Sequence, residues 1–252
     1  TQGPEAGTRV FPPRDVTGTY LQALEQPERK LRIAVWQKNY FGVPVHPDCQ
    51  AAVDKAIQAC LALGHEVHED MPQLPIADMF AGMGVVTSVG MLASIHQREQ
   101  RLGRAVREDE IEPLDWRSLQ QARGHTAQQM LAARSSFDTG GRILDQFLAR
   151  YDLILTPTTA APAPLLGALS LDQPFESFVP EAMKASAYTA LFNMGGQPAM
   201  SVPMHWTADN IPVGAHFVAR FGSEGRLLRL AAQLEQAAPW AQRMPDVSIF
   251  KA

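Results

Sequence analysis

Five short stretches of the chain show the hydrophobic pattern of β-strands. In residues 31–36, apolar and polar positions alternate at the start, and residues 151–158 are an apolar run, typical of a buried strand, that ends in Thr-Pro-Thr. Residues 198–203 lie between two prolines, and residues 212–220 follow them after a short gap. The five stretches are residues 31–36, 65–69, 151–158, 198–203 and 212–220.

Apolar positions at helical spacing predict helices between these strands. The best defined begins at Pro47-Asp48, repeats apolar positions through Leu61, and stops at Gly64. Strand, helix, glycine and strand in this order predict a βαβ unit and therefore a partly parallel sheet. We expect an α/β fold, a mixed β-sheet flanked by helices. The other expected helices are 16–24, 76–101, two within 114–151 with a break near Gly140-Gly141, 180–191 and 224–237.

The long helix predicted over 76–101 carries three glycines: Gly82, Gly84 and Gly90. Each glycine inside a helix costs roughly 1 kcal/mol relative to alanine. They therefore indicate either a core helix that is kinked at this point, or a helix that another group approaches closely, such as the wall of a pocket.

Length and charge set broad limits on the class of protein. The chain has 252 residues, 46% of them hydrophobic and 19% charged, which suits one or two globular domains. A net charge of −4 gives no electrostatic reason to expect nucleic acid or an anionic membrane as a partner. No apolar run approaches the length of a membrane span by inspection, and no signal peptide is recognised. We expect a cytoplasmic protein.

The two cysteines support that location. Cys49 and Cys60 are eleven positions apart in one predicted helix, so they face one side but lie about 16 Å apart along its axis. A disulfide needs Cα atoms within about 7 Å. We interpret both as reduced core thiols; the alternative, a catalytic cysteine, lacks any activating neighbour in the sequence.

No motif for a metal or a nucleotide is present. The seven histidines include no helical His-x-x-x-His pair, and there is no Cys-x-x-Cys. Gly-x-Ser-x-Gly, Walker and Gly-x-Gly-x-x-Gly motifs are also absent. We therefore predict no cofactor and no metal site. A Ser-His-Asp triad stays open, because its members need not be close in sequence.

Residues 192–203 read Phe-Asn-Met-Gly-Gly-Gln-Pro-Ala-Met-Ser-Val-Pro, a tight glycine turn followed by a strand. Pro-Val-Gly at 212–214 and an amphipathic helix follow, and Asp-Leu-Ile-Leu-Thr-Pro-Thr at 152–158 precedes them. This order resembles the C-terminal part of an amidase signature hydrolase. The resemblance implies the C-terminal portion of that fold over residues 1–252, with 1–30 as a loop-rich lead-in.

The family hydrolyses amide C–N bonds with a serine, a second serine in a cis peptide bond, and a lysine. The Gly-Gly-Ser-Ser-Gly-Gly-Ser type segment that carries the serines is absent here, and none of the five lysines has the family context. The resemblance therefore implies that the catalytic residues lie upstream, and no catalytic residue is assigned. The expected partners are a small-molecule amide, the missing N-terminal half, and a second copy in a homo-oligomer.

Two other functions remain open at this point. The chain could be a non-catalytic binding or structural protein with an amidase-like fold, or an unrelated α/β enzyme with a dispersed triad. For substrate binding we hypothesise that three segments approach one cleft, because ligands bind beyond the ends of strands in such sheets. The alternative is that Asn193 only caps its turn. The proposed substrate-binding residues are Asn193, Gly195, Gly196, Gln197, Thr156, Pro157, Thr87 and Ser88.

Overall fold

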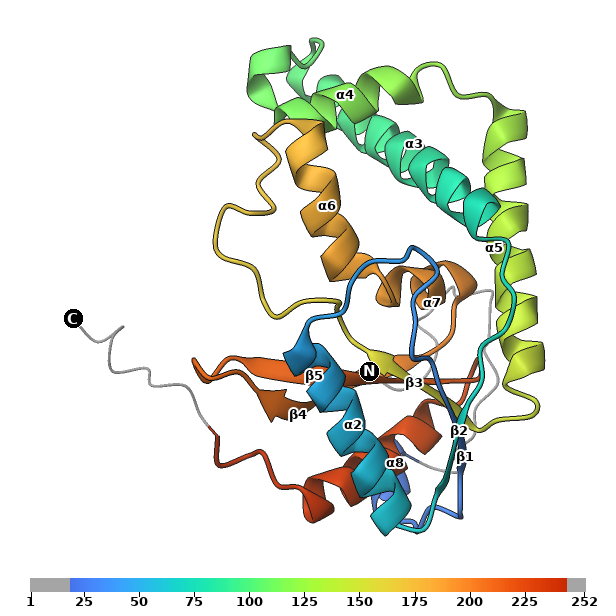
Figure 1. The fold of residues 1–252 in the computed structure, drawn as a ribbon. Coiled ribbons are helices and arrows are strands. Elements are labelled where there is room, and N and C mark those ends of the chain that lie inside the picture. Colours follow the sequence, from blue (N-terminus) through green and yellow to red (C-terminus); the bar gives the residue numbers. More distant parts are fainter. Residues whose placement is uncertain (1–18, 244–252) are drawn as a thin grey trace.

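The computed structural model describes residues 19–243. Within them the chain forms five strands and eight α-helices (Figure 1). The strands are β1 (Arg32–Val35), β2 (Glu66–Glu69), β3 (Leu153–Pro157), β4 (Ala199–Trp206) and β5 (Pro212–Ala219). The helices are α1 (Tyr20–Leu24), α2 (Pro47–Ala62), α3 (Ile76–Leu102), α4 (Pro113–Ala122), α5 (Ala127–Phe147), α6 (Phe175–Ser186), α7 (Thr189–Gly195) and α8 (Glu224–Ala237), with a 3-10 helix at Glu108–Glu110.

The strands form one mixed sheet in the order β2-β1-β3-β5-β4. β1 pairs in parallel with both β2 and β3, whereas β5 pairs antiparallel with both β3 and β4. The predicted βαβ unit and mixed sheet are confirmed. All five strands lie where the hydrophobic pattern placed them.

One face of the sheet is closed by α2 and α8 (Figure 1). α2 begins where predicted, because His46 caps it by accepting a hydrogen bond from Asp48 N at 3.2 Å and Pro47 occupies its first turn. Its buried face consists of small side chains, Cys49 and Cys60 among them. Both thiols are buried and form no disulfide, as predicted. Burial raises the pKa of Cys49 to about 11 and that of Cys60 to about 12.

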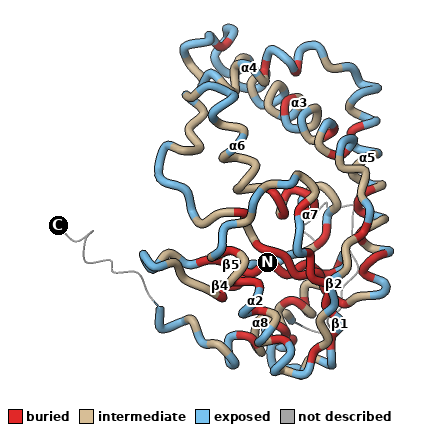
Figure 2. The backbone as a smooth tube through the Cα atoms, viewed as in Figure 1, coloured by how far each residue is buried: buried red, intermediate tan, exposed pale blue. Residues whose placement is uncertain are grey.

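The opposite face of the sheet is covered by α5 and α7, with Met79 of α3 reaching in. Trp36 lies at its centre, with its ring 5.3 Å from that of Phe192 and 5.7 Å from that of Tyr40. This cover extends over β1, β3 and part of β5. Figure 2 shows the consequence: buried backbone is concentrated in the strands and the helices against them, while α3, α4 and α6 are mostly partly buried or exposed.

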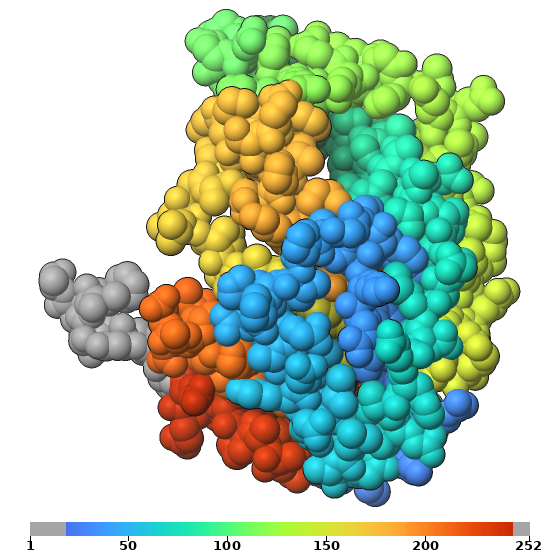
Figure 3. Space-filling view, viewed as in Figure 1, coloured from blue at the N-terminus to red at the C-terminus, as the bar shows by residue number. Residues whose placement is uncertain are grey.

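α3 packs against α4 and α5 but leaves most of its apolar surface open, and α6 has little packed against it. α3 is long and apolar enough to cross a membrane by length and composition, with a mean hydropathy of 1.6 over an 18-residue window of which 17% is buried. The prediction that no stretch approaches that length is therefore wrong for α3. α6 buries none of its residues. It is tied at its ends, by Arg117 over the Phe175 ring at 4.2 Å and by Ala160 N donating to Lys184 O at 2.8 Å. The surface is hollowed beside α6 (Figure 3).

Three glycines in the long helices, Gly82, Gly140 and Gly141, allow close packing, whereas a Cβ at Gly84 or Gly90 of α3 would meet nothing within 4 Å. α3 runs through Gly82 without interruption, and a Cβ at Gly82 would lie 2.8 Å from Ser136 Oγ of α5. The predicted break at Gly140-Gly141 is wrong, because both lie inside α5 and the connection from α4 to α5 falls at residues 123–126. A Cβ at Gly141 would lie 2.6 Å from the Gly195 carbonyl oxygen. These glycines therefore bring α5 against α3 and α7.

Two further boundaries differ from prediction. The helix predicted to begin at Pro180 begins five residues earlier, and Pro180 lies inside α6. The tight turn predicted at 193–196 is the last turn of α7, closed by Gly196 in the left-handed region at φ 82. The short helix predicted over 16–24 is confirmed for Tyr20–Leu24; residues 16–18 and most of the lead-in loop lie outside the described residues.

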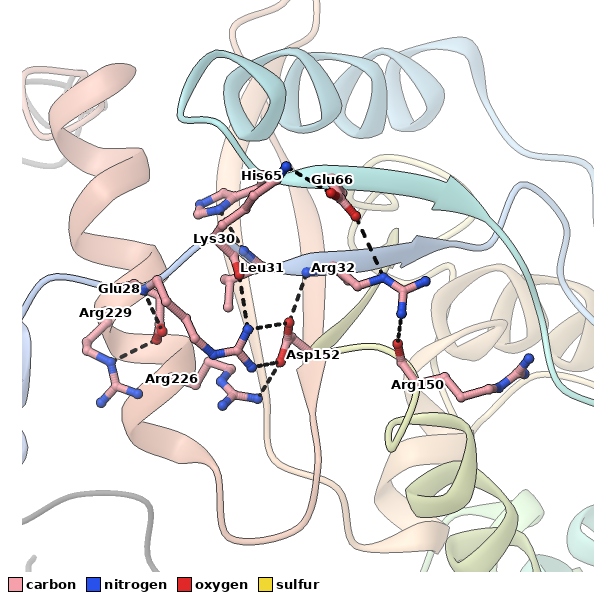
Figure 4. Close-up of polar contacts among 11 residues, drawn as sticks. Glu28, Lys30, Leu31, Arg32, His65, Glu66, Arg150, Asp152, Arg226 and Arg229 are labelled. Atoms are coloured by element: carbon pink, nitrogen blue, oxygen red, sulfur yellow. Dashed lines mark hydrogen bonds and ion pairs between the residues drawn. The ribbon is translucent and has the colours of Figure 1, made fainter.

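A charged clamp holds the lead-in segment against the start of β3 (Figure 4). Asp152 accepts hydrogen bonds from both Arg29 guanidinium nitrogens, from Arg226 at 3.0 Å and from Arg32 N at 2.9 Å. Glu28 pairs with Arg229 at 2.8 Å, and the two side chains are 5% and 10% exposed. The clamp lies at the amino end of β3, so it stabilises the end opposite to the Thr-Pro-Thr motif.

Candidate functional site

Three sequence motifs, Thr-Pro-Thr at 156–158, Pro-Ala-Met-Ser at 198–201 and Pro-Val-Gly at 212–214, meet at the carboxyl end of β3. Thr158 follows β3 directly, Ser201 lies in β4, and Gly214 lies between them in β5. The hydroxyls of Thr158 and Ser201 are 2.7 Å apart. A Cβ at position 214 would lie 2.2 Å from Ser201 Oγ and 2.6 Å from Thr158 Oγ1. Gly214 therefore leaves the space that the hydroxyl pair occupies.

Behind this pair lies a second pair of neutral polar groups. Ser201, His216 and Thr156 are neighbours across the sheet, in register on adjacent strands. Thr156 Oγ1 donates to Pro157 O at 2.7 Å, and His216 Nδ1 lies 3.1 Å from Thr156 Oγ1. Because a threonine has one hydroxyl hydrogen, the proton between them belongs to Nδ1 of His216. Burial lowers the pKa of His216 to about 4, so the ring is neutral near pH 7.

Thr156 and His216 resemble a nucleophile and its base, but their surroundings exclude that role. Thr156 is fully buried and its hydrogen already bonds to Pro157 O. His216 is 5% exposed and packs against the ring of Phe192, 5.5 Å away. A nucleophile needs access to its substrate and a free base. This pair is therefore part of the interior support of the hydroxyl pair.

The end of α7 positions the other predicted residues. Gln197 is 7% exposed, and its Nε2 donates to Gly141 O and to Asp145 Oδ1, both at 3.2 Å. Phe221 N donates to the same carboxylate at 3.3 Å. The Gln197 side chain thus joins the turn to α5, and its Oε1 is buried without a hydrogen-bond partner. Asn193 is exposed on α7.

The structure brings together two of the three predicted segments. Phe192 of α7 packs on His216, which bonds Thr156, so the α7 end and the end of β3 are neighbours. Thr87 and Ser88 lie on α3, where their hydroxyls bond to carbonyls of their own helix at 2.8 Å and 3.2 Å. A groove of about 520 Å³ between α3 and α5 has neither residue in its lining. Their place in a common cleft stays a prediction.

The described residues contain no cluster of three or more metal-ligating side chains. No lysine among the described residues forms a hydrogen bond with a serine. Lys55 contacts His205 at 2.9 Å, and Lys184 forms an ion pair with Glu181. His205 bonds Asp48 at 2.9 Å on its other nitrogen, which makes a surface Asp-His-Lys chain without a hydroxyl nucleophile. Within residues 19–243, these contacts therefore assemble no serine nucleophile with a base.

Comparison with known proteins assigns the region that contains the three motifs to a family. Residues 4–228 match the Amidase family. The chain belongs to the amidase family. It is 30% identical over 237 residues to the 6-aminohexanoate-cyclic-dimer hydrolase of Paenarthrobacter ureafaciens and, over the same length, to that of Pseudomonas sp. (strain NK87). Each alignment covers 90% of this chain and 48% of the relative.

Solved amidases show the same fold. The structure of 6-aminohexanoate cyclic dimer hydrolase complexed with substrate superposes with a TM-score of 0.86 at 28% identity, over 97% of this chain and 52% of that one. A bacterial aryl acylamidase of the amidase signature family superposes with a TM-score of 0.72 at 21% identity, which supports the fold alone. The family and fold predictions are thus confirmed. The chain spans about half the length of the relatives that it matches.

Prediction from sequence missed the residues where the motifs converge: Thr158, Ser201, Gly214 and His216. Each lies inside or next to a motif segment that had been singled out, so the signal was present in the Thr-Pro-Thr, Pro-Ala-x-Ser and Pro-Val-Gly elements. What the sequence lacked was the register of β3, β5 and β4, which places them side by side.

Proposed function

We propose that this chain is the C-terminal half of an amidase that hydrolyses small-molecule amides in the cytoplasm. In this proposal an upstream half supplies the serine, the cis-bonded serine and the lysine, and this chain supplies one side of the substrate site. The observation that carries it is the match to the amidase family over most of the chain, but over about half of each relative.

The uncovered surfaces support a missing partner. An amphipathic helix stabilises a protein by burying its apolar face, yet α6 buries no residue and α3 leaves most of its apolar window open. Leu165 and Leu166, in the loop before α6, are 88% and 104% exposed. Large exposed apolar surface marks an interaction site. We propose that the catalytic half packs there and that a second copy of the chain does so when that half is absent.

The first test is enzymatic. The chain alone is expected to hydrolyse no aryl or alkyl amide above the buffer rate, because loss of the nucleophile removes nearly all of such an enzyme's acceleration. The chain supplied together with a catalytic amidase half is expected to show turnover, with that half alone as the control. Turnover by the purified chain alone would contradict the proposal.

The second test concerns the open surfaces. Light scattering of the chain alone is expected to show self-association, and a dye that fluoresces on apolar surface is expected to bind. Both signals should fall when the catalytic half is added. A monomer at high concentration with no dye binding would favour the alternative of a self-contained binding or structural protein.

A further inference from the structure

We propose that the hydroxyl pair of Thr158 and Ser201 binds a neutral amide group of the substrate other than the one that is cleaved. The inference rests on the proposed function for the identity of the ligand as an amide. The pair lies beyond the carboxyl end of β3, where ligands of α/β sheets bind. Ser201 is exposed and Thr158 is partly buried, so both can reach a ligand.

The hydrogen-bonding capacity of the pair matches an amide. Two hydroxyls carry two donors and four lone pairs, and the 2.7 Å bond between them uses one of each. One O–H donor and three lone pairs remain. An amide carbonyl can accept the free hydrogen while an amide N–H donates to a free lone pair. An ester or ether could use the donor alone, so an amide satisfies the site more fully.

The surroundings select against charge. Within residues 19–243, no hydrogen bond joins either hydroxyl to a charged side chain. The neighbouring polar side chains toward the interior are His216, which is neutral, and Thr156, which is fully buried. A carboxylate or an ammonium ion would therefore find no opposite charge among the groups that bond to these hydroxyls. The site fits a neutral group that both donates and accepts.

The backbone holds the two hydroxyls in place. Thr158 follows β3 and Ser201 lies in β4; both lie over Gly214 of β5, and Thr158 N donates to Gly214 O at 3.3 Å. A glycine within a strand weakens the strand and often marks a close approach by a ligand or another backbone. In β5 this destabilising glycine, Gly214, lies directly beneath the hydroxyl pair. Neither hydroxyl needs to be ordered by the ligand, which lowers the entropic cost of binding.

The test compares ligands of equal length on this chain in solution. The 15N-labelled chain is titrated with hexanediamide, hexanedioate and hexane-1,6-diammonium, and backbone amide shifts are followed. We expect the diamide to shift the signals of Thr158, Ser201 and Gly214 with millimolar affinity, and the two ions to shift them far less. Ser201→Ala and Thr158→Val should each weaken diamide binding about fivefold, the worth of one neutral hydrogen bond.

A matched variant controls for loss of any exposed hydroxyl. Ser94→Ala removes an exposed serine on α3 whose hydroxyl bonds to Gly90 O of its own helix, and it should leave the titration unchanged. Thermal melting of each variant establishes that it is folded. Shifts centred elsewhere, equal binding of the ions, or equal binding by Ser201→Ala would overturn the inference. The inference would also be overturned if Ser201→Ala binds the diamide as the wild type does but no longer associates with the catalytic half.

A kinetic arm separates this inference from the proposed function. In the chain joined to its catalytic half, Ser201→Ala should raise KM about fivefold for a diamide, leave kcat within twofold, and leave a monoamide of equal length unaffected. Hydrolysis with no such split contradicts the inference alone. Binding that depends on Ser201 without any hydrolysis contradicts the proposed function alone, and neither binding nor hydrolysis contradicts both.

Discussion

The two faces of the sheet differ in how completely they are covered. Under α2 and α8, the side chains of Ile33, Leu153, Leu155 and Phe217 are fully buried in one apolar cluster. On the other face the cover by α5 and α7 ends over β5, where the polar row of Thr156, His216 and Ser201 begins. The first face is closed by apolar packing within the chain. On the second, the apolar cover stops short and the polar side chains of the motifs follow it.

The largest expected effect comes from the closed face. Phe217→Ala removes a fully buried ring from the cluster under α2 and α8. It should lower the free energy of unfolding by about 3–5 kcal/mol. Urea denaturation followed by circular dichroism measures the change. A loss below about 1 kcal/mol, the size expected at exposed positions, would contradict the view that this face carries the stability.

Acidification should lower the free energy of unfolding nearly as much as Phe217→Ala does, through His216 on the second face of the sheet. Because burial depresses the pKa of His216 to about 4, the unfolded chain binds a proton between pH 6.5 and 4 that the folded chain does not. Stability should be complete above pH 6.5 and fall by up to about 3 kcal/mol as the pH drops to 4.

His216→Gln isolates this contribution. Burial also lowers the pKa of His65, which acts in the same direction, so the difference between wild type and variant is the quantity to measure. Unfolding free energies at pH 8, 6.5, 5 and 4 should converge for the two proteins as the pH falls. Parallel pH profiles would show that His216 is not a buried neutral group.

A methyl group at the hydroxyl pair tests how tightly the open face is built. Gly214→Ala places a Cβ against Ser201 Oγ and Thr158 Oγ1 and should cost about 1–3 kcal/mol through overpacking. Adding Ser201→Ala removes the nearer clash and should recover part of the loss. A double-mutant cycle by thermal melting measures that coupling. Strict additivity would mean that the hydroxyl moves aside freely.

The smallest effect is expected on α6. Phe178→Ala changes an aromatic residue of a helix that buries none of its side chains. It should change the free energy of unfolding of the chain alone by less than about 1 kcal/mol, in contrast to Phe217→Ala. The same variant should weaken association with the catalytic half. A large loss of stability in the chain alone would mean that α6 already belongs to the core.

The parts of the fold that could be predicted from sequence are those governed by local pattern. α2 and α8 have clear amphipathic spacing, and the strands are short apolar runs between turn residues. Pro180 misled the prediction of α6, because a proline usually begins a helix rather than lying within it. Gly141 indicated a break because its partner, the Gly195 carbonyl, is distant in sequence. The Thr158–Ser201 contact likewise depends on strand pairing.

The pairing of the strands also bears on the order in which the chain folds. β4 and β5 form a hairpin through the short turn at 207–211, whereas Val35 of β1 pairs with Leu155 only after α2 to α5 have been placed between them. Closing a long loop costs entropy before its contacts form, so distant pairings form slowly. We expect pulsed hydrogen exchange to protect the amides of β5 that face β4 before those of β1. The hairpin that carries Ser201 and Gly214 would then exist before the sheet that supports it.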